Sequence, residues 1–385
     1  MSWPQTRLGD VCEIVSGATP KTGTPAYWDG DIAWATPKDL SDNDGKYLYD
    51  TPRKITADGF RSCSLKMLPA GSILLSSRAP IGLVAINRMP VCTNQGFKNL
   101  VPRKTSVSSD YLYWWLRCNR TRVEQAGRGA TFKEISKAIV ESLEIPLPPL
   151  AEQKRIAGIL DAADALRAKR REAIAQLDAL LQSTFLDMFG NPATNPMGWE
   201  ECTVGDVTGC IVPGRDKPKS FTGTTPWITT DDLMDLAVTS HSPKVIGLSE
   251  QEIDEVRARV IPKGSVIISC VGDLGISSIA GCDLVVNQQL HTFQCGERIN
   301  SQFLTFCLPF QKPWMKRRAT QTTLPYLNKT NCNSIPIIVP PLDLQRRFAT
   351  IVETVEQQKA RMRSHLAELH ALFASLQSRA FKGEI

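Results

Sequence analysis

The sequence predicts an α/β (α+β) protein in which two similar globular regions alternate with two long helices. The first observation is a repeat, because the stretch from Ile145 to Gly190 returns from Ile337 to Gly383 at a constant offset. The second is a pattern of short apolar runs, broken by Gly, Pro, Asn and Asp, ahead of each copy. The third is apolar residues three and four apart within each copy, which is typical of an amphipathic helix. One repeat of this length is too long for a solenoid, so the chain is a duplicated half-protein.

The first globular region, residues 1–145, carries the signals of short strands joined by tight turns. Ser72–Leu75 follows a Pro-Ala-Gly turn, and Leu83–Ile86 precedes an asparagine. The aromatic run Tyr111–Cys118 predicts a short buried helix. The second region, residues 195–337, repeats this order of strand and helix signals.

The positions that shape the fold recur between the two regions, whereas the residues between them differ. The segment MLPAGSILLSS from Met67 returns as VIPKGSVIISC from Val260, and Asn94-Gln95 returns as Asn287-Gln288. This pattern is expected if both regions share a fold but recognise different ligands.

The segments 146–190 and 338–385 are predicted to be spacer helices that begin at paired prolines, since proline suits a first helical turn. Each is roughly 40 residues, or about 60 Å. A helix of that length needs a partner for its apolar stripe, and the other copy is the simplest one, packed antiparallel as a coiled coil. Arg170, Gln358 and His365 are expected to interrupt the stripe. The apolar positions are Ile156, Ile159, Ala163, Leu166, Ala173, Leu177 and Leu180, then Phe348, Ile351, Val355, Met362, Leu369, Leu372 and Leu376.

Composition restricts the class of protein only loosely. The 385 residues are 42% hydrophobic and carry a net charge of +6, which permits nucleic-acid binding without requiring it. The 11 cysteines form no C-x-x-C pair, so neither a metal site nor a disulfide framework is predicted. With no secretory segment at the start and no membrane-spanning apolar run, we expect a reduced, cytoplasmic protein.

A set of motifs closely resembles the specificity subunit of Type I restriction-modification enzymes. The resemblance covers essentially the whole chain. It rests on GATP (17–20), TPKDL (36–40), PAGSILLSSRAPIG (69–82), NQGFK (94–98), TFKEIS (131–136) and IPLPPLAEQKRI (145–156).

The resemblance implies two target-recognition domains that each read one part of a split site in double-stranded DNA, joined by two helical spacers. It also implies two methyltransferase subunits as partners, and usually motor-nuclease subunits. S-adenosylmethionine and ATP would be bound by these partners, so no cofactor is expected on this chain. The second region departs from the pattern, since Arg78-Ala79-Pro80 becomes Val271-Gly272-Asp273 and Gly96-Phe97 becomes Gln289-Leu290.

The residues alone also favour a binding module over an enzyme. No phosphate-binding G-x-x-x-x-G-K-[ST] loop and no Asn/Asp-Pro-Pro-aromatic tetrad is present, and the four histidines form no catalytic pattern, so no catalytic residue is predicted. Three alternatives remain: a DNA-modifying enzyme in its own right, the specificity module of a related restriction or defence system, and a pure assembly scaffold.

DNA readout requires cations for phosphates and amides or guanidinium groups for base edges. Arg78 stands out because its counterpart in the second region differs. Asn94-Gln95 and Asn287-Gln288 recur, so they could instead hold a turn or contact the DNA backbone, and Trp34 and Trp227 are expected in the core. The DNA-binding candidates are Lys21, Lys38, Arg78, Asn94, Gln95, Lys98, Arg128, Thr131 and Lys133 in the first region, and Arg215, Lys217, Lys219, Thr230, Asn287, Gln288, His291, Arg317, Arg318, Gln321, Thr322 and Tyr326 in the second.

Overall fold

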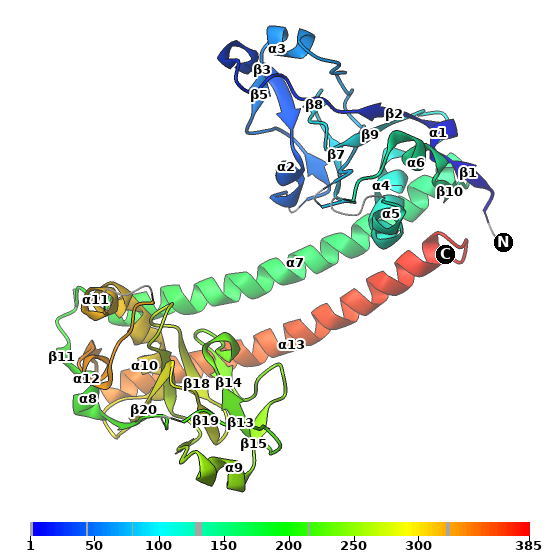
Figure 1. Ribbon diagram of the computed structural model, residues 1–385. Coiled ribbons are helices and arrows are strands. Elements are labelled where there is room, and N and C mark those ends of the chain that lie inside the picture. Colours follow the sequence, from blue (N-terminus) through cyan, green and yellow to red (C-terminus); the bar gives the residue numbers. More distant parts are fainter. Residues whose placement is uncertain (1–2, 44, 79, 128–132, 215, 321–323) are drawn as a thin grey trace. The chain divides into compact units, whose positions relative to one another are not determined.

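The computed structural model describes residues 3–43, 45–78, 80–127, 133–214, 216–320 and 324–385 (Figure 1). Contacts divide the chain into two compact units. The first unit comprises residues 1–171 and 365–385, and the second comprises residues 172–364. Each unit therefore contains one globular region together with a part of each long helix.

The globular region of the first unit is built on a five-stranded sheet beside a three-stranded one. The five strands follow the order β2 (Cys12–Ser16), β9 (Lys98–Pro102), β6 (Ile73–Leu75), β7 (Val84–Asn87) and β4 (Tyr47–Leu48). The three are β5 (Lys54–Ile55), β3 (Trp28–Ala35) and β8 (Cys92–Thr93). In the five-stranded sheet all neighbours are antiparallel except β4 and β7.

The second unit repeats this sheet strand for strand. Its five strands follow the order β12 (Thr208–Ile211), β20 (Leu290–Cys295), β17 (Val266–Ser269), β18 (Ser277–Ala280) and β14 (Val238–Thr239), and only β14 and β18 are parallel neighbours. The smaller sheet contains β15 (Gly247–Leu248), β13 (Thr225–Ile228), β19 (Leu284–Val286) and β16 (Val260–Ile261). The same order and direction confirm that the two regions share one fold.

Helices and one further strand pair complete each unit. The pairs are β1 (Gln5–Arg7) with β10 (Glu144–Pro146), and β11 (Glu200–Thr203) with β21 (Pro336–Val339). The first region has α1 (Leu8–Val11), α2 (Pro37–Ser41), α3 (Ala57–Arg61), α4 (Ser109–Cys118), α5 (Arg120–Ala126), α6 (Lys137–Ser142) and the 3-10 turn η1 (Pro25–Tyr27). The second has α8 (Val204–Val207), α9 (Glu250–Glu255), α10 (Ser301–Cys307), α11 (Lys312–Arg318), α12 (Lys329–Asn333) and the 3-10 turns η2 (Thr230–Asp232) and η3 (Leu308–Gln311).

The predicted aromatic helix is α4, and its side chains are core residues. Tyr111, Trp114 and Trp115 are almost fully buried, in one cluster with Ile156 of the following long helix. The Trp114 ring lies 5.5 Å from the ring of Phe373, centroid to centroid. Burial of such large rings is a main source of stability for the unit.

The two long helices are α7 (Leu150–Phe189), 40 residues long, and α13 (Leu342–Ala380), 39 residues long. Both start next to a fully buried glutamine, Gln153 or Gln345, which the sequence analysis did not single out. Each glutamine accepts a hydrogen bond from one backbone N–H and donates to two backbone carbonyls, one of which belongs to Pro148 or Pro340. These bonds tie the helix start to the loop ahead of α4 or α10.

Within the second unit, α7 and α13 pack antiparallel as predicted. The rings of Phe189 and Phe348 lie 5.6 Å apart, and Lys359 contacts Asp178 at 2.5 Å. Residue numbers thus fall along α13 as they rise along α7. In the first unit, the Arg167 guanidinium on α7 lies 3.6 Å from the centre of the Phe373 ring on α13.

The predicted apolar stripes were wrong at four positions. Leu166, Leu180, Ile351 and Leu372 are exposed by 36–54% of their surface. The buried positions include Leu160, Leu181, Val352 and Phe373 instead. Apolar residues adjoin one another at several of these places, as at Leu180-Leu181, so spacing alone could not decide which one faces the partner helix.

The predicted interruptions were also misplaced. Gln358 and His365 are exposed, and Arg170 is half-buried. Two other charged residues lie in the buried stripe, Arg167 at 9% exposure and Lys359 at 4%. Arg167 is buried because Asp164 neutralises its charge, and Asp178 and Glu356 neutralise that of Lys359.

Candidate functional site

A tight turn between β8 and β9, and its counterpart between β19 and β20, carries the recurring Asn-Gln pair. The side-chain oxygen of Asn94 accepts a hydrogen bond from the Gly96 N–H at 2.9 Å. Asn287 accepts one from the Gln289 N–H at 3.1 Å. The recurring asparagines therefore hold the same turn in both regions. Of the two alternatives left open for them, holding a turn and contacting the DNA backbone, this is the first.

The backbone around this turn is also the same in both regions. The Ser77 N–H donates to the Gly96 carbonyl at 2.7 Å, and the Cys270 N–H donates to the Gln289 carbonyl at 2.9 Å. Arg78 and Val271 follow these two donors directly in sequence. They therefore occupy equivalent places, as do Gly96 and Gln289.

Arg78 lies beside this turn. A Cβ atom added to Gly96 would lie 3.6 Å from the Arg78 Nε atom, so the arginine runs alongside the glycine. Among the described residues Arg78 has no hydrogen bond or ion pair, and its side chain is half-buried. A half-buried guanidinium that has no partner in the described part of the chain is available to a ligand with two acceptors, such as the major-groove edge of guanine.

The glutamines after the recurring asparagines are exposed and reach the loop that follows the first strand of each five-stranded sheet. Gln95 accepts a hydrogen bond from the Thr19 hydroxyl, and Gln288 donates to the Gly214 carbonyl at 3.4 Å. Each glutamine thus links two loops that carry DNA-binding candidates, among them Lys21 and Lys217.

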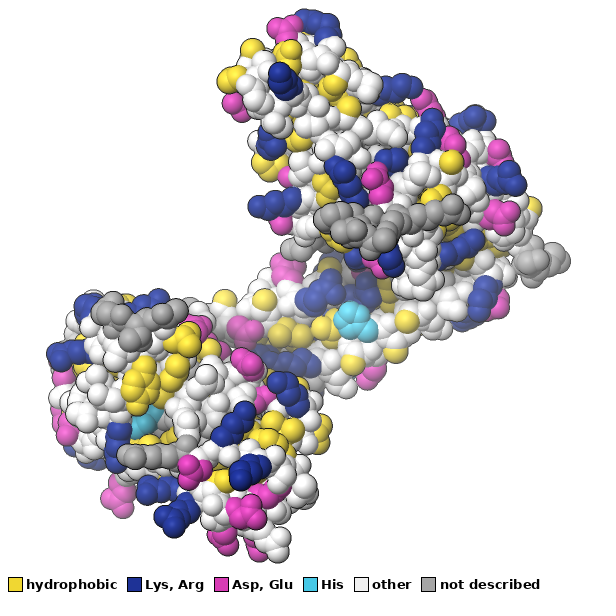
Figure 2. Space-filling model, viewed as in Figure 1, with side chains coloured by type: hydrophobic (Ala, Val, Ile, Leu, Met, Phe, Trp, Pro, Cys, Tyr) yellow, Lys and Arg dark blue, Asp and Glu magenta, His cyan; other side chains and the backbone are white. Residues whose placement is uncertain are grey.

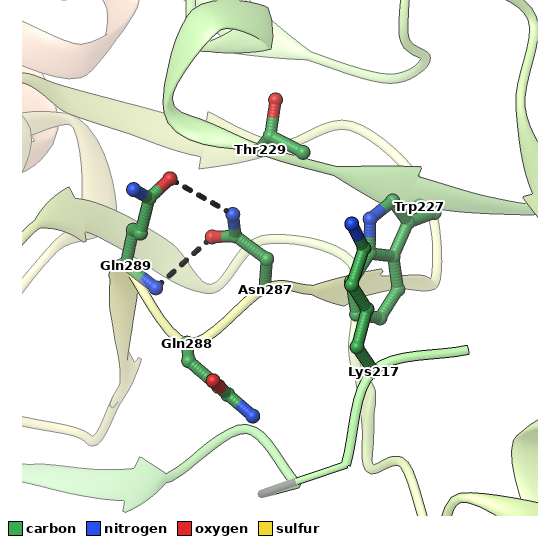
Figure 3. A pocket seen from close by; sticks show the side chains of 6 residues that line it. All are labelled: Lys217, Trp227, Thr229, Asn287, Gln288 and Gln289. Carbon is green, nitrogen blue, oxygen red and sulfur yellow. Dashed lines mark hydrogen bonds between the residues drawn. The ribbon is translucent and has the colours of Figure 1, made fainter. Parts of the chain in front are cut away.

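In the second unit two hollows adjoin this turn, each about 340 Å³. Gln288 lines both of them. Figure 3 shows the first hollow, where the amides of Asn287 and Gln289 face each other and Lys217 lies beside Trp227. Tyr326, Lys329 and His291 line the second.

Two of the predicted DNA contacts are buried and already have partners within the protein. The Lys98 ammonium pairs with Glu134 at 3.2 Å, and only 11% of the lysine side chain is exposed. His291 contacts the Cys210 sulfur and the Asn333 side-chain oxygen, both at 3.1 Å. Burial lowers the pKa of His291 to about 4, although the bond to Asn333 opposes the shift, so the ring is neutral near pH 7.

The remaining described candidates lie at the surface. Figure 2 shows Lys and Arg side chains scattered over the globular regions with acidic residues between them. The exposed candidates are Lys21, Lys38, Lys133, Lys217, Lys219, Arg317, Arg318 and Tyr326, while Thr230 is half-buried. Arg128, Thr131, Arg215, Gln321 and Thr322 lie outside the described residues.

Trp34 and Trp227 are buried in the core as predicted, at 2% and 6% exposure. Gln289 and Lys329 were not among the predicted contacts. The signal for Gln289 was the change from Gly96 at that place in the motif. Within the described ranges, no group of three or more His, Cys, Asp or Glu side chains could hold a metal ion, and no helix is long and apolar enough to cross a membrane.

Comparison with known proteins identifies the family to which the chain belongs. A family model described as the type I restriction modification DNA specificity domain matches residues 2–176 and again residues 196–371. The type I restriction enzyme MjaIX specificity subunit of Methanocaldococcus jannaschii is 26% identical over 426 residues, covering 100% of this chain and 93% of that protein. The EcoDI specificity subunit of Escherichia coli is 22% identical over 430 residues, covering 100% and 89%.

Two solved structures share the fold. One, from a study of complex assembly and conformational transition of the type I R-M system, has a TM-score of 0.63 at 19% identity and covers 100% of this chain and 98% of its own. The other, the S subunit of a Type I restriction-modification system from M. genitalium, has a TM-score of 0.60 at 15% identity and covers 99% and 96%.

Two copies of one DNA-specificity domain in a single chain define a protein of the DNA-recognition class. The chain belongs to the type I restriction modification DNA specificity domain family.

Proposed function

We propose that this chain reads a bipartite, asymmetric sequence in duplex DNA, with one half-site for each globular region. The observation that carries the proposal is the shared turn with unlike side chains. The backbone is held by equivalent hydrogen bonds in both regions, yet it presents Arg78 and Gly96 in one and Val271 and Gln289 in the other. Side chains with different donors and acceptors select different base edges.

We further propose that the chain is the non-catalytic subunit of a cytoplasmic complex with two methyltransferase subunits and, where the host has them, motor-nuclease subunits. Those partners would bind S-adenosylmethionine and ATP. The duplication supports a pair of like partners, because a repeated chain offers each docking surface twice. The sequence lacks the phosphate-binding loop and the methyltransferase tetrad that the partners' reactions require.

Mapping methylated adenines in DNA from cells that express this chain with its methyltransferase tests the proposal. We expect one motif with two unlike halves and a fixed gap of unread bases. Footprinting the complex on that motif should protect both halves. A complex that assembles but methylates without sequence preference would leave only the assembly scaffold. Methyl transfer by the purified chain alone would make it a DNA-modifying enzyme.

Substitution of Arg78 by alanine tests the first half-site. Because a guanidinium that forks onto guanine is worth about 1–3 kcal/mol of discrimination, Arg78→Ala should relax one base position in one half-site only. Arg61→Ala is a matched control, since Arg61 is an exposed arginine of the same unit that pairs with Asp58 at 2.6 Å. An equal loss on all DNA sequences would reassign Arg78 to a phosphate contact, and unchanged binding would leave it a surface residue.

A further inference from the structure

Gln289 stands at the place that Gly96 occupies in the first region, and it puts an amide where the first region has no side chain. The side chain is exposed and lines the hollow drawn in Figure 3. Because the turn is held by the same backbone bonds in both regions, this amide is an addition to a common frame.

Hydrogen bonds fix which end of the Gln289 amide is the oxygen. The Gln289 backbone N–H can only donate, so the Asn287 atom that receives it at 3.1 Å is the oxygen Oδ1. The other end of the Asn287 amide is then the nitrogen Nδ2, which donates to the Gln289 side chain at 3.0 Å. The receiving atom on Gln289 is therefore Oε1, and the orientation follows from a backbone donor.

This arrangement leaves Gln289 with a defined set of free groups. Its Nε2 amino group has no partner among the described residues. Oε1 keeps a second lone pair, which the Thr230 hydroxyl contacts only at a long 3.4 Å. A hydroxyl can rotate away, so Gln289 offers one donor and one acceptor side by side. The major-groove edge of adenine presents the complementary pair, an N7 acceptor and an N6 donor.

We propose that Gln289 reads an adenine in the half-site of the second globular region, with Asn287 as the positioning residue that orients its amide. This inference rests on the proposed function. The first region offers different groups at this place. Gly96 has no side chain, so the Asn94 amino group has no partner among the described residues, and Arg78 adds further donors. Donors such as the Asn94 amino group and the Arg78 guanidinium suit guanine, so the two regions differ at this place in the purine they select.

The test is selection of bound DNA from a pool of randomised duplexes by the full chain in complex with its methyltransferase. The variant is Gln289→Glu, which keeps the shape and the acceptor for Asn287 but removes both side-chain donors. We expect the preference for adenine at one position to fall by about 10-fold or more, with a shift toward cytosine, whose amino group a carboxylate accepts. Gln289→Ala should lose the preference without gaining a new one. Gln251→Glu, the same change at an exposed glutamine of α9, should leave the motif unchanged.

The affected position must lie in the half-site that Arg78→Ala leaves intact. The inference is overturned if Gln289→Glu leaves the motif unchanged, if it weakens all sequences equally, or if the altered position is not adenine in the wild-type motif. A wild-type complex that enriches no bipartite motif would instead refute the proposed function. A two-part motif that is enriched by the wild-type complex and stays unchanged at every position in Gln289→Glu refutes the inference alone.

Discussion

Lys98 and His291 occupy the same place in the two five-stranded sheets, but one is a charged side chain with a charged partner and the other is a neutral ring with neutral partners. Leu100 pairs with Ile73 across β9 and β6, and Phe293 pairs with Val266 across β20 and β17. Lys98 and His291 each stand two residues earlier on their strands. The lysine is held by the Glu134 carboxylate at 3.2 Å, whereas the histidine is held by neutral groups.

The neighbouring segment explains why the two solutions differ. The Ile135 N–H donates to the Ser77 carbonyl, and the Leu327 N–H donates to the Cys270 carbonyl, so the residues just before them, Glu134 and Tyr326, are also equivalent. In the first region Glu134 supplies a carboxylate and β9 carries Lys98. In the second region the equivalent residue is Tyr326 and β20 carries the neutral ring of His291. A buried charge is tolerated only with its partner, and in the second region the lysine and the carboxylate are both absent from these two positions.

The two units also differ in how the globular region contacts α7. In the first unit the Lys46 ammonium lies 2.7 Å from both Asp110 and Asp161, and Asp161 also accepts from the Trp114 ring N–H at 2.8 Å. In the second unit an apolar hollow of about 180 Å³, lined by Phe185, Leu236 and Phe306 among others, adjoins α7.

The largest expected effect comes from placing the lysine of the first region in the second. His291→Lys would bury an ammonium next to Lys329 with no carboxylate at position 326. An unpaired buried charge costs about 3–5 kcal/mol, and denaturant unfolding of the full chain should show this loss. Adding Tyr326→Glu should restore part of it, because the double variant recreates the Lys98–Glu134 pair. A single variant as stable as wild type would contradict the comparison.

Acidification should weaken the second unit through His291. Its pKa is about 4 in the folded protein and about 6.5 when unfolded, so the unfolded chain binds the extra proton first as pH falls. The stabilisation is therefore complete above pH 6.5 and is lost as pH falls toward 4. Between pH 7 and pH 5 the loss should be about 2 kcal/mol.

Comparison of wild type with His291→Gln isolates this effect from the carboxylates and from the other histidines, which both proteins share. Cys210 and Lys329 flank the ring, and burial raises the pKa of the Cys210 thiol, so that group stays protonated over this range. Equal slopes of stability against pH for the two proteins would show that His291 is not held neutral.

The duplication, the order of elements and the aromatic helix could be predicted from the sequence because they depend on local patterns. Turn signals, apolar runs and paired prolines report what each segment does by itself. The fate of Arg167 and Lys359 could not be predicted in this way. Their burial depends on groups of the other long helix as well as on local carboxylates, and these groups are Asp178 for Lys359 and the Phe373 ring for Arg167.

The sequence could predict which side chains are of a type that binds DNA, but not which of them already have partners within the protein. Lys98 and His291 fit the pattern of DNA-binding side chains, yet both have partners inside the protein. Gln289 directly follows the predicted pair Asn287-Gln288 but was not itself predicted. Which of its side-chain groups can bind a ligand depends on the orientation that Asn287 gives to its amide. Availability depends on contacts between distant segments, which a sequence pattern does not report.

The smallest expected effect comes from removing the charge that holds Lys98. Glu134→Gln keeps an oxygen acceptor in place but leaves the ammonium unpaired. Because the Glu134 side chain is 42% exposed, water compensates in part, and the loss should be only about 1–2 kcal/mol in denaturant unfolding. Lys98→Met in the Glu134→Gln background should recover most of this loss, since an apolar chain of similar size needs no partner. If the double variant is no more stable than Glu134→Gln, the ammonium is already solvated. The lysine and the histidine would then differ by chance rather than through their neighbours.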